Sequence, residues 1–459
     1  MRQTVTFFGG LHTIGGINVM VGCGDTAIIF DLGRMPTGYF NWYGSNVSAP
    51  AERAIREYIL VKNAPPVMGL YDPKLLGDLT GEEITAAWEG KEFPGYKNLF
   101  AFVSHIHQDH MALLPYIAEN ITVFMHEEAL VTYKAVVASG EYTDSKARLV
   151  GLPDGGEQEL GDGMSIKIVE LDHDTPGASG ILVRTPDHKV FFTGDYRLHG
   201  RHSHRVEDKI KMLREENITL LITEGTTLRY ESLDWDKART HELDLPFHYK
   251  EMLKDLEGLA YINILARNVE RVADFINATR ECGRKLVMDC QTARLWHTAI
   301  GGGIKTLEEN PALSDTDTVV LLDEAVSGLP YGSVTLRDIV SKKGEYTVYL
   351  TQRMLPLMIE FEKLGQKCRP SRYFHADGNP LTDTDPTLTY WLRELGVEYH
   401  YHGTGGHAIP KMLTFFVTGV NPKVVVPVHS VNPSILDTGN VRKLLPSYGQ
   451  TINLEDIAL

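Results

Sequence analysis

The stretch NLFAFVSHIHQDHM, residues 98–111, decides how the rest of the chain is interpreted. It begins as an apolar run typical of a buried strand, and it ends in His105, His107, Asp109 and His110. His105 and His107 are two residues apart, so an extended backbone would point both imidazoles to the same side. Imidazole and carboxylate are the usual donors to Zn²⁺, and both also accept Mn²⁺ or Fe²⁺. The pattern predicts a site for two neighbouring cations, with a histidine-rich polar loop as the alternative.

Composition excludes several classes of protein. The chain has 459 residues, 43% hydrophobic and 23% charged, which allows two or three domains with sizeable cores. Because the net charge is −15, a basic nucleic-acid-binding stripe cannot dominate the surface, although a local basic groove is allowed. The four cysteines form no C-x-x-C pair, which argues against a zinc ribbon or disulfide framework and fits a reducing cytoplasm. Without a signal peptide or a membrane-spanning apolar run, we expect a cytoplasmic protein with no membrane partner.

The order of short apolar runs predicts one α/β domain inserted into another. Strands rich in β-branched and aromatic residues are expected in the first half and again near the end. From about residue 230, helices such as 268–283 alternate with strands, which is typical of an α/β layer. We place the first part of the outer domain at 1–228, the inserted domain at 229–385 and the completion of the outer domain at 386–459.

The ends of later strands supply further candidate ligands. His173 follows the predicted strand 164–171, Asp195 ends the strand 189–195, and His429 follows the apolar run VVVPV. Each alone has a simpler interpretation, as a loop histidine or as an aspartate that caps a turn. Together they would complete a ligand set at one edge of a sandwich, where the Asp195 carboxylate could bridge two ions.

These residues resemble the metallo-β-lactamase superfamily, whose second motif is H-x-H-x-D-H. The first motif, an aspartate after a strand, matches Asp31 in IIFDLG. The third matches His173, and the fourth matches Asp195 in TGDYR.

The resemblance continues into the β-CASP branch, the nucleic-acid-processing nucleases. ITEGT with Glu224, HGTGGHA with His407 and PVHS with His429 look like motifs A, B and C of that branch. Within it, LHTIGG, RTPDHKVFFTGD, GGHA and PKVVVPVH look most like RNase J, over most of residues 1–230 and 395–430. The chain departs from RNase J after motif C, where Ser430 and Val431 replace a Gly-Glu pair.

The resemblance implies an α/β fold, the metallo-β-lactamase αββα sandwich with an inserted β-CASP-type α/β domain. It also implies two divalent metal ions, Zn²⁺ in the first place and Mn²⁺ as the alternative, that activate a hydroxide for attack on phosphorus. The ligands carried over are His105, His107 and His173 for the first ion, Asp109, His110 and His429 for the second, and Asp195 as the bridge.

The remaining roles also come from the resemblance. Asp109 would orient the nucleophile, and His407 on its Gly-rich loop would be the general acid for the leaving oxygen. Glu224 would orient His407 and keep it protonated. Asp31 would hold the ligand-bearing loops in place without itself binding an ion. A plain turn at HGTGGHA and a plain strand-end acid at Glu224 are the alternatives.

The implied activity is metal-dependent cleavage of single-stranded RNA or DNA, by exonuclease or endonuclease action. A thioesterase- or lactonase-type hydrolase of small molecules is the first alternative, and a catalytically idle scaffold is the second. The insertion, Glu224 and His407 favour the nuclease, because a small-molecule hydrolase does not need them. Since only a short segment follows His429, we expect the separate C-terminal domain of RNase J to be absent, and a homo-oligomer remains open.

Two further stretches carry weaker signals. RLHGRHSHR, residues 197–205, is expected as a solvated loop near the site, whose arginines could meet phosphates. A third metal site on its histidines is the alternative. The start of the predicted helix 268–283, with Arg267, Asn268 and Arg271, would bind a phosphate or be a plain solvated helix start.

Overall fold

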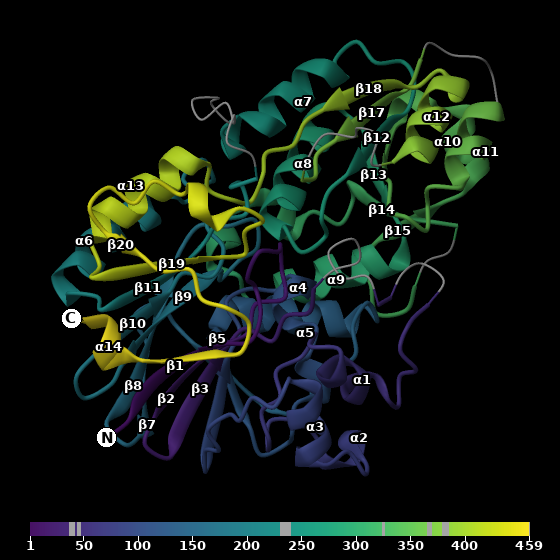
Figure 1. The fold of residues 1–459 in the computed structure, drawn as a ribbon. Coiled ribbons are helices and arrows are strands. Elements are labelled where there is room, and N and C mark those ends of the chain that lie inside the picture. The colour runs from purple at the N-terminus through teal and green to yellow at the C-terminus, as the bar shows by residue number, and fades with distance from the viewer. Residues whose placement is uncertain are drawn as a thin grey trace.

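The computed structural model describes residues 1–35, 42–43, 47–229, 240–323, 326–364, 370–378 and 385–458. Within these residues the strands form three sheets of seven strands each. Two of the sheets lie face to face, and the third forms a separate layer above them, at the upper right of Figure 1.

The first sheet combines both ends of the chain with the histidine-rich segment. In sheet order its strands are β21 (Gln450–Asn453), β1 (Gln3–Phe7), β2 (Val19–Cys23), β3 (Thr26–Phe30), β4 (Asn98–Phe102), β5 (Thr122–His126) and β6 (Arg148–Leu152). The strands from β3 to β6 run parallel, so the loops that follow them lie at one edge.

The second sheet joins segments that are about two hundred residues apart. Its strands are β20 (Arg442–Lys443), β19 (Val424–Val428), β11 (Leu220–Glu224), β10 (Lys189–Phe192), β9 (Ser179–Arg184), β8 (Met164–Glu170) and β7 (Glu157–Gly161). β19 pairs in parallel with β11, and β11 pairs in parallel with β10. The residues that follow these three strands therefore meet at one edge of the sheet.

The two sheets bury a shared apolar layer and are covered outside by helices. Inside, the rings of Phe30 and Phe192 stack with centroids 5.6 Å apart. On the outer side of the first sheet lie α1 (Ala54–Leu60), α2 (Pro73–Leu76), α3 (Gly81–Ala87), α4 (Gln108–Met111) and α5 (Glu127–Ala138). On the second sheet lie α6 (Ser203–Glu216) and α13 (Pro410–Val420), and α14 (Leu454–Ala458) contacts β1. The predicted αββα sandwich is confirmed.

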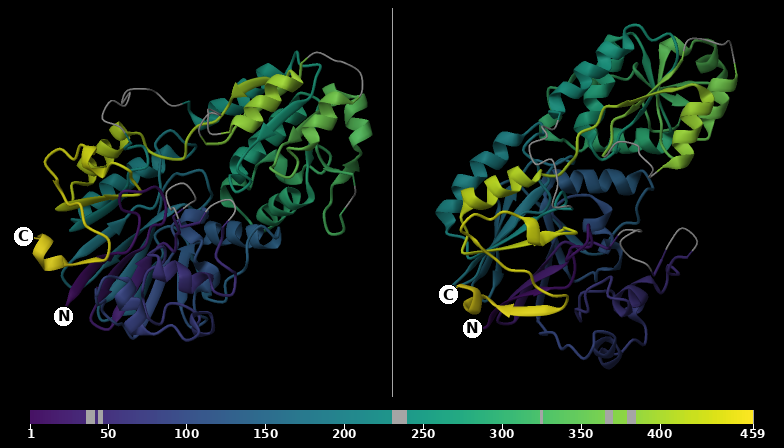
Figure 2. Two further views of the ribbon diagram at one scale, coloured as in Figure 1. Left: turned by 45° about the vertical axis from the view of Figure 1, so that its right-hand side comes forward. Right: turned by 45° about the horizontal axis from the view of Figure 1, so that its top comes forward.

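The third sheet is parallel throughout and belongs to the inserted segment. Its strands are β15 (Gly332–Val334), β14 (Val319–Leu322), β13 (Lys285–Met288), β16 (Tyr346–Tyr349), β12 (Ala260–Asn263), β17 (Arg372–His375) and β18 (Glu398–Tyr401). One face packs on α7 (Leu245–Leu253), α8 (Val269–Glu281) and α9 (Cys290–Gly301). The other packs on α10 (Leu336–Ser341), α11 (Leu357–Lys363) and α12 (Pro386–Leu395), as Figure 2 shows.

The inserted layer ends later than the predicted boundary at residue 385. β18 pairs in parallel with β17, and α12 buries Leu388 and Leu392 in the core of this layer. Residues 386–401 therefore belong to the third sheet and its helices, and the chain returns to the sandwich between β18 and α13.

The cysteines and the helices bear on two expectations from the sequence, that the chain has neither a disulfide framework nor a membrane span. Cys23, Cys282 and Cys290 are free, and Cys368 lies outside the described residues. No helix in the described ranges has the length and apolarity needed to cross a membrane.

The stacked pair between the sheets gives a test of the sandwich core. Replacing Phe192 by Ala should lower the free energy of unfolding by about 3–5 kcal/mol, because it leaves a cavity where the two sheets meet. The free energy is measured by denaturant-induced unfolding. Phe415→Ala is the matched control, because that ring is 51% exposed and its loss should change stability little. Equal stability of the two variants would contradict the packing described here.

Candidate metal centre

All seven side chains predicted as metal ligands lie at one edge of the sandwich. The loop after β4 and the short helix α4 that follows it carry four of them, and the loops after β8, β10 and β19 carry one each. Their donor atoms form three overlapping groups in which every atom lies within 4.8 Å of the others. The groups are His105, His107 and His173; His105, His110 and Asp195; and Asp109, His110 and His429.

The first group is a cluster of three imidazoles. His105 Nε2 lies 3.0 Å from His107 Nδ1, and His173 Nε2 lies 3.4 Å from the same atom. Three nitrogens at such separations can all reach one central ion at the roughly 2 Å typical of zinc–imidazole bonds.

The group of Asp109, His110 and His429 combines two imidazoles with a carboxylate. Asp109 Oδ2 lies 3.1 Å from His429 Nε2 and 3.8 Å from His110 Nε2. This is a second set of donors that could hold an ion beside the first.

Asp195 connects the two groups through a single oxygen. Its Oδ2 lies 3.8 Å from His105 Nε2, 3.1 Å from His110 Nε2 and 3.8 Å from His429 Nε2. The position between the two donor groups fits a bridging carboxylate.

The protonation states suit a cation site. Burial lowers the pKa of His105 well below its usual value and that of His173 to about 3, so both imidazoles are neutral. Burial opposes ionisation of Asp195, but the neighbouring imidazoles of His429 and His110 outweigh it and hold the pKa of this carboxyl well below its usual range. Neutral nitrogens and ionised oxygens are the forms that bind metal ions.

Three of the imidazoles have their second ring nitrogen within hydrogen-bond distance of a partner, which orients the ring. Ser104 Oγ lies 3.0 Å from His105 Nδ1, and Asp31 Oδ2 lies 2.7 Å from His110 Nδ1. Thr226 Oγ1 lies 2.6 Å from His429 Nδ1. Asp31 also accepts from the Ser104 amide, so it ties the loop after β3 to the loop after β4.

His173 is oriented from the loop that carries His407. Its Nδ1–H donates to the Gly406 carbonyl at 2.5 Å. Gly406 has to be a glycine because a Cβ there would lie 2.5 Å from His173 Cε1. The close approach thus fixes both the ligand and the neighbouring loop.

Asp174 was missed by the sequence interpretation. Its Oδ1 lies 3.1 Å from His107 Nε2 and 3.2 Å from His173 Nε2. A carboxylate this close to His107 Nε2 favours the tautomer with the proton on that nitrogen, which leaves Nδ1 free to face an ion. An acidic residue directly after a candidate ligand, as in LDHD, is the signal that could have pointed to it.

His407 and Glu224 face the same centre. His407 Nδ1 lies 3.5 Å from Glu224 Oε2 and 3.6 Å from Asp195 Oδ2. Burial alone would lower the pKa of His407, but the carboxylates of Glu224 and Asp195 outweigh it and raise this pKa to about 9. Glu224 also accepts from the amides of Thr226 and Ala408, which hold its carboxylate in place.

The donor set fits the divalent ions that the fold implies. Within the described part of the chain, His110 Nε2 and Asp195 Oδ1 are buried and have no hydrogen-bond partner. Buried polar atoms without partners are costly unless something else binds them. Asp31 and His429 also adopt the left-handed backbone region, with φ of 55° and 52°, a strain that is common at functional sites.

The arginine- and histidine-rich stretch is not a solvated loop, which corrects the sequence expectation. Arg197 is 2% exposed and donates to Glu242 at 2.8 Å, and Glu242 also binds Arg271 at the start of α8. His199 is buried and lies 2.8 Å from the Gly405 carbonyl, and His202 pairs with Glu270. Neither Arg197 nor Arg271 is therefore available to a phosphate.

Comparison with known proteins matches this architecture. A family model described as "Beta-lactamase superfamily domain" matches residues 98–254. A solved structure of a protein of unknown function from Enterococcus faecalis V583 is 25% identical, with a TM-score of 0.77 over 99% of this chain and 100% of that one.

Curated relatives carry the name Ribonuclease J. The protein from Mycoplasma genitalium is 20% identical over 41% of this chain and 32% of its own length. The protein from Thermus thermophilus is 23% identical over 48% of this chain and 40% of its own length. The protein from Pyrococcus abyssi is 22% identical over 71% of this chain and 73% of its own length. This chain thus spans about a third to two fifths of the first two relatives.

Asp174 provides a test of the centre that does not depend on catalysis. Asp174→Ala should weaken metal binding by about tenfold to hundredfold, because His107 loses the acceptor that fixes its tautomer. The affinity is measured by chelator competition, with bound ions counted by mass spectrometry. The control is Asp78→Ala, whose side chain is 90% exposed far from the centre. An unchanged affinity in the Asp174 variant would contradict the role inferred from the geometry.

Proposed function

We propose that this chain, which contains a metallo-β-lactamase superfamily domain and has relatives of the RNase J-like β-CASP branch, is a metal-dependent phosphodiesterase acting on single-stranded nucleic acid. The observation that carries the proposal is the pair His407 and Glu224, which faces Asp195 at the centre of the donor cluster. A hydrolase of neutral small molecules does not need a protonated imidazole at that position.

The proposed ligands are His105, His107 and His173 for one ion, Asp109, His110 and His429 for the other, and Asp195 between them. Two divalent ions held there would supply a water of lowered pKa as nucleophile and positive charge against the phosphate oxygens. The imidazole-rich donor set favours Zn²⁺ and also accepts Mn²⁺.

The chain's own residues would then position the reactants and move the proton. Asp109 would accept a hydrogen bond from the attacking water and orient it. His407, protonated at neutral pH, would donate its proton to the leaving oxygen of the phosphodiester. Glu224 would keep His407 charged and turned toward the centre, because its carboxylate is itself fixed by two backbone amides.

RNA is the substrate that we propose, and the name of the curated relatives supports it. The test is digestion of single-stranded RNA and DNA oligonucleotides by protein loaded with Zn²⁺ or Mn²⁺. Release of mononucleotides from one end would identify an exonuclease, and fragments of intermediate length an endonuclease. Absence of cleavage by well-metallated protein, with turnover of thioesters or lactones, would overturn the proposal in favour of a small-molecule hydrolase.

The acid role of His407 predicts a pH dependence. His407 is protonated below its pKa of about 9, so activity should fall as the pH rises toward that value, and bound cations shift the fall to lower pH. Glu224→Gln removes a charge that raises this pKa, so the fall should move to lower pH in the pH–rate profile. His407→Ala should lower turnover by about 10²- to 10⁴-fold.

The matched control is His204→Ala, since that histidine is exposed on α6. Metal content is measured for every variant, so that a lost ion is not mistaken for a lost acid. A pH profile that is the same in wild type and Glu224→Gln would contradict the assigned pair.

A further inference from the structure

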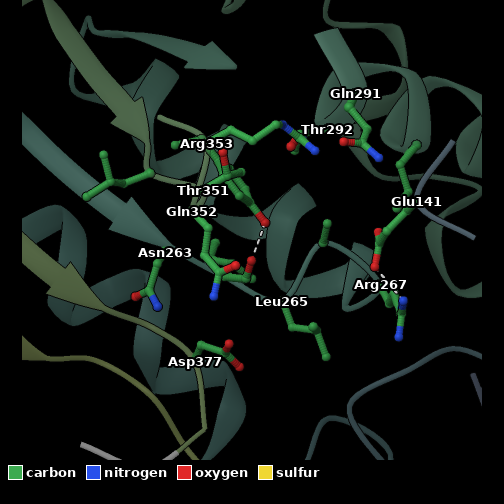
Figure 3. Close-up of a pocket in the computed structure, with 15 residues that line it drawn as sticks. Glu141, Asn263, Leu265, Arg267, Gln291, Thr292, Thr351, Gln352, Arg353 and Asp377 are labelled. Atoms are coloured by element: carbon green, nitrogen blue, oxygen red, sulfur yellow. Dashed lines mark hydrogen bonds and ion pairs between the residues drawn. The ribbon is translucent and has the colours of Figure 1, made fainter. Parts of the chain in front are cut away.

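A cavity that is separate from the donor cluster lies at the edge of the inserted sheet. It has a volume of about 450 Å³ and lies at the carboxyl ends of β12 and β16, beside the start of α9. Crevices at the carboxyl ends of parallel strands are where open α/β sheets commonly bind ligands. Figure 3 shows the polar side chains that surround this cavity.

One residue that lines the cavity contacts the loop that carries the candidate ligands. Arg267 lines it, is only 4% exposed, and donates from Nη1 to the Ile106 carbonyl at 3.3 Å. Ile106 lies between His105 and His107 in the sequence. Asp377 also lines the cavity and is labelled in Figure 3. Burial raises the pKa of Asp377, and so does the nearby carboxylate of Asp174, the residue beside His107 and His173. A ligand in the cavity would therefore lie next to the metal centre.

The two arginines that line the cavity are each paired with a carboxylate of the protein. Arg267 forms an ion pair with Glu141, and Arg353 lies 3.0 Å from the Asp289 carboxylate. A site with paired charges has no excess of positive charge to attract a phosphate. The cavity therefore does not have the chemistry of an anion site.

The other lining groups suit a flat, neutral molecule with hydrogen-bonding edges. Gln291 and Gln352 contribute amides, each with a donor and an acceptor, and Leu265 and Leu295 contribute apolar surface. Asn263 adds an amide whose Oδ1 already accepts from the Ala376 amide. In addition, Arg267 Nε is buried and has no hydrogen-bond partner within the described residues. Side-chain amides read nucleobases by paired donor and acceptor contacts, and single-stranded substrates expose the base edges that such contacts need.

We propose that this cavity binds a nucleobase of the substrate strand, at a nucleotide that flanks the scissile phosphodiester. The inference rests on the proposed nuclease function and adds base selectivity to it. The metal centre would act on the backbone, and the amides of the inserted domain would distinguish the base.

The experiment compares wild type with the double variant Gln291→Ala/Gln352→Ala. Both side chains lie at least partly in solvent, so their loss should not affect folding. Gln158→Ala, on the distant strand β7, is the matched control. Cleavage rates are measured on RNA oligonucleotides that differ in one base at each position near the cut. Affinities for the same oligonucleotides are measured by fluorescence anisotropy on metal-free protein.

Wild type should prefer one base at one position by about tenfold, in rate and in affinity, as expected for paired amide contacts. The double variant should lose this preference, and the Gln158 variant should keep it. An identical base profile in wild type and double variant would overturn the proposal, and so would a loss that is equal for all bases. If the metallated wild type cleaves nothing, the proposed activity fails, and the anisotropy series alone then decides whether the cavity reads bases.

Discussion

The centre depends on a balance of charge within one buried volume. Burial keeps His105 and His173 neutral, whereas their imidazole neighbours keep Asp109 and Asp195 ionised. Low-dielectric surroundings strengthen the attraction of such carboxylates for a cation, and neutral imidazoles add donors without adding repulsion. Burial alone would lower the pKa of His110, but in the absence of a metal the carboxylates that face this imidazole outweigh burial and raise the pKa. His110 then carries a proton, which supplies the positive charge that a bound ion would otherwise supply. Metal binding there would displace that proton.

The loop that carries His407 couples the two halves of the molecule. Three successive carbonyls of this loop accept hydrogen bonds: Thr404 from Arg271 in the inserted domain, and Gly405 and Gly406 from His199 and His173 in the sandwich. Glu242 binds both Arg271 and Arg197, so the loop is held between the domains by a buried ion network. Breaking such a network would leave an uncompensated buried charge, which is strongly unfavourable. The position of His407 is therefore set by the packing of the inserted domain on the sandwich.

Sequence reasoning succeeded where the information is local. The spacing of His105, His107, Asp109 and His110, whose donor atoms lie together in the structure, depends on a few neighbouring residues. It failed where the partner lies far along the chain: Arg197 looked solvated because Glu242, which buries its charge, is 45 residues away. The side chains of residues 398–401 alternate as in a strand of any sheet. The sequence pattern therefore could not show that β18 pairs with β17 and extends the inserted layer.

The distribution of charge also bears on how an acidic chain would act on the polyanion that we propose as its substrate. Arg197, Arg267 and Arg271 near the centre are each paired with a carboxylate of the protein, so they add no net positive field there. Under the proposed function, attraction for the phosphate would come from the bound ions, and further binding energy from neutral contacts such as the amides of the cavity in the inserted domain. Phosphate contacts by lysine and arginine release counterions and so weaken steeply with salt. Substrate binding through bound ions and base contacts would depend instead on how fully the metal sites are occupied. The protein would then bind its substrate well only when the metals needed for catalysis are present.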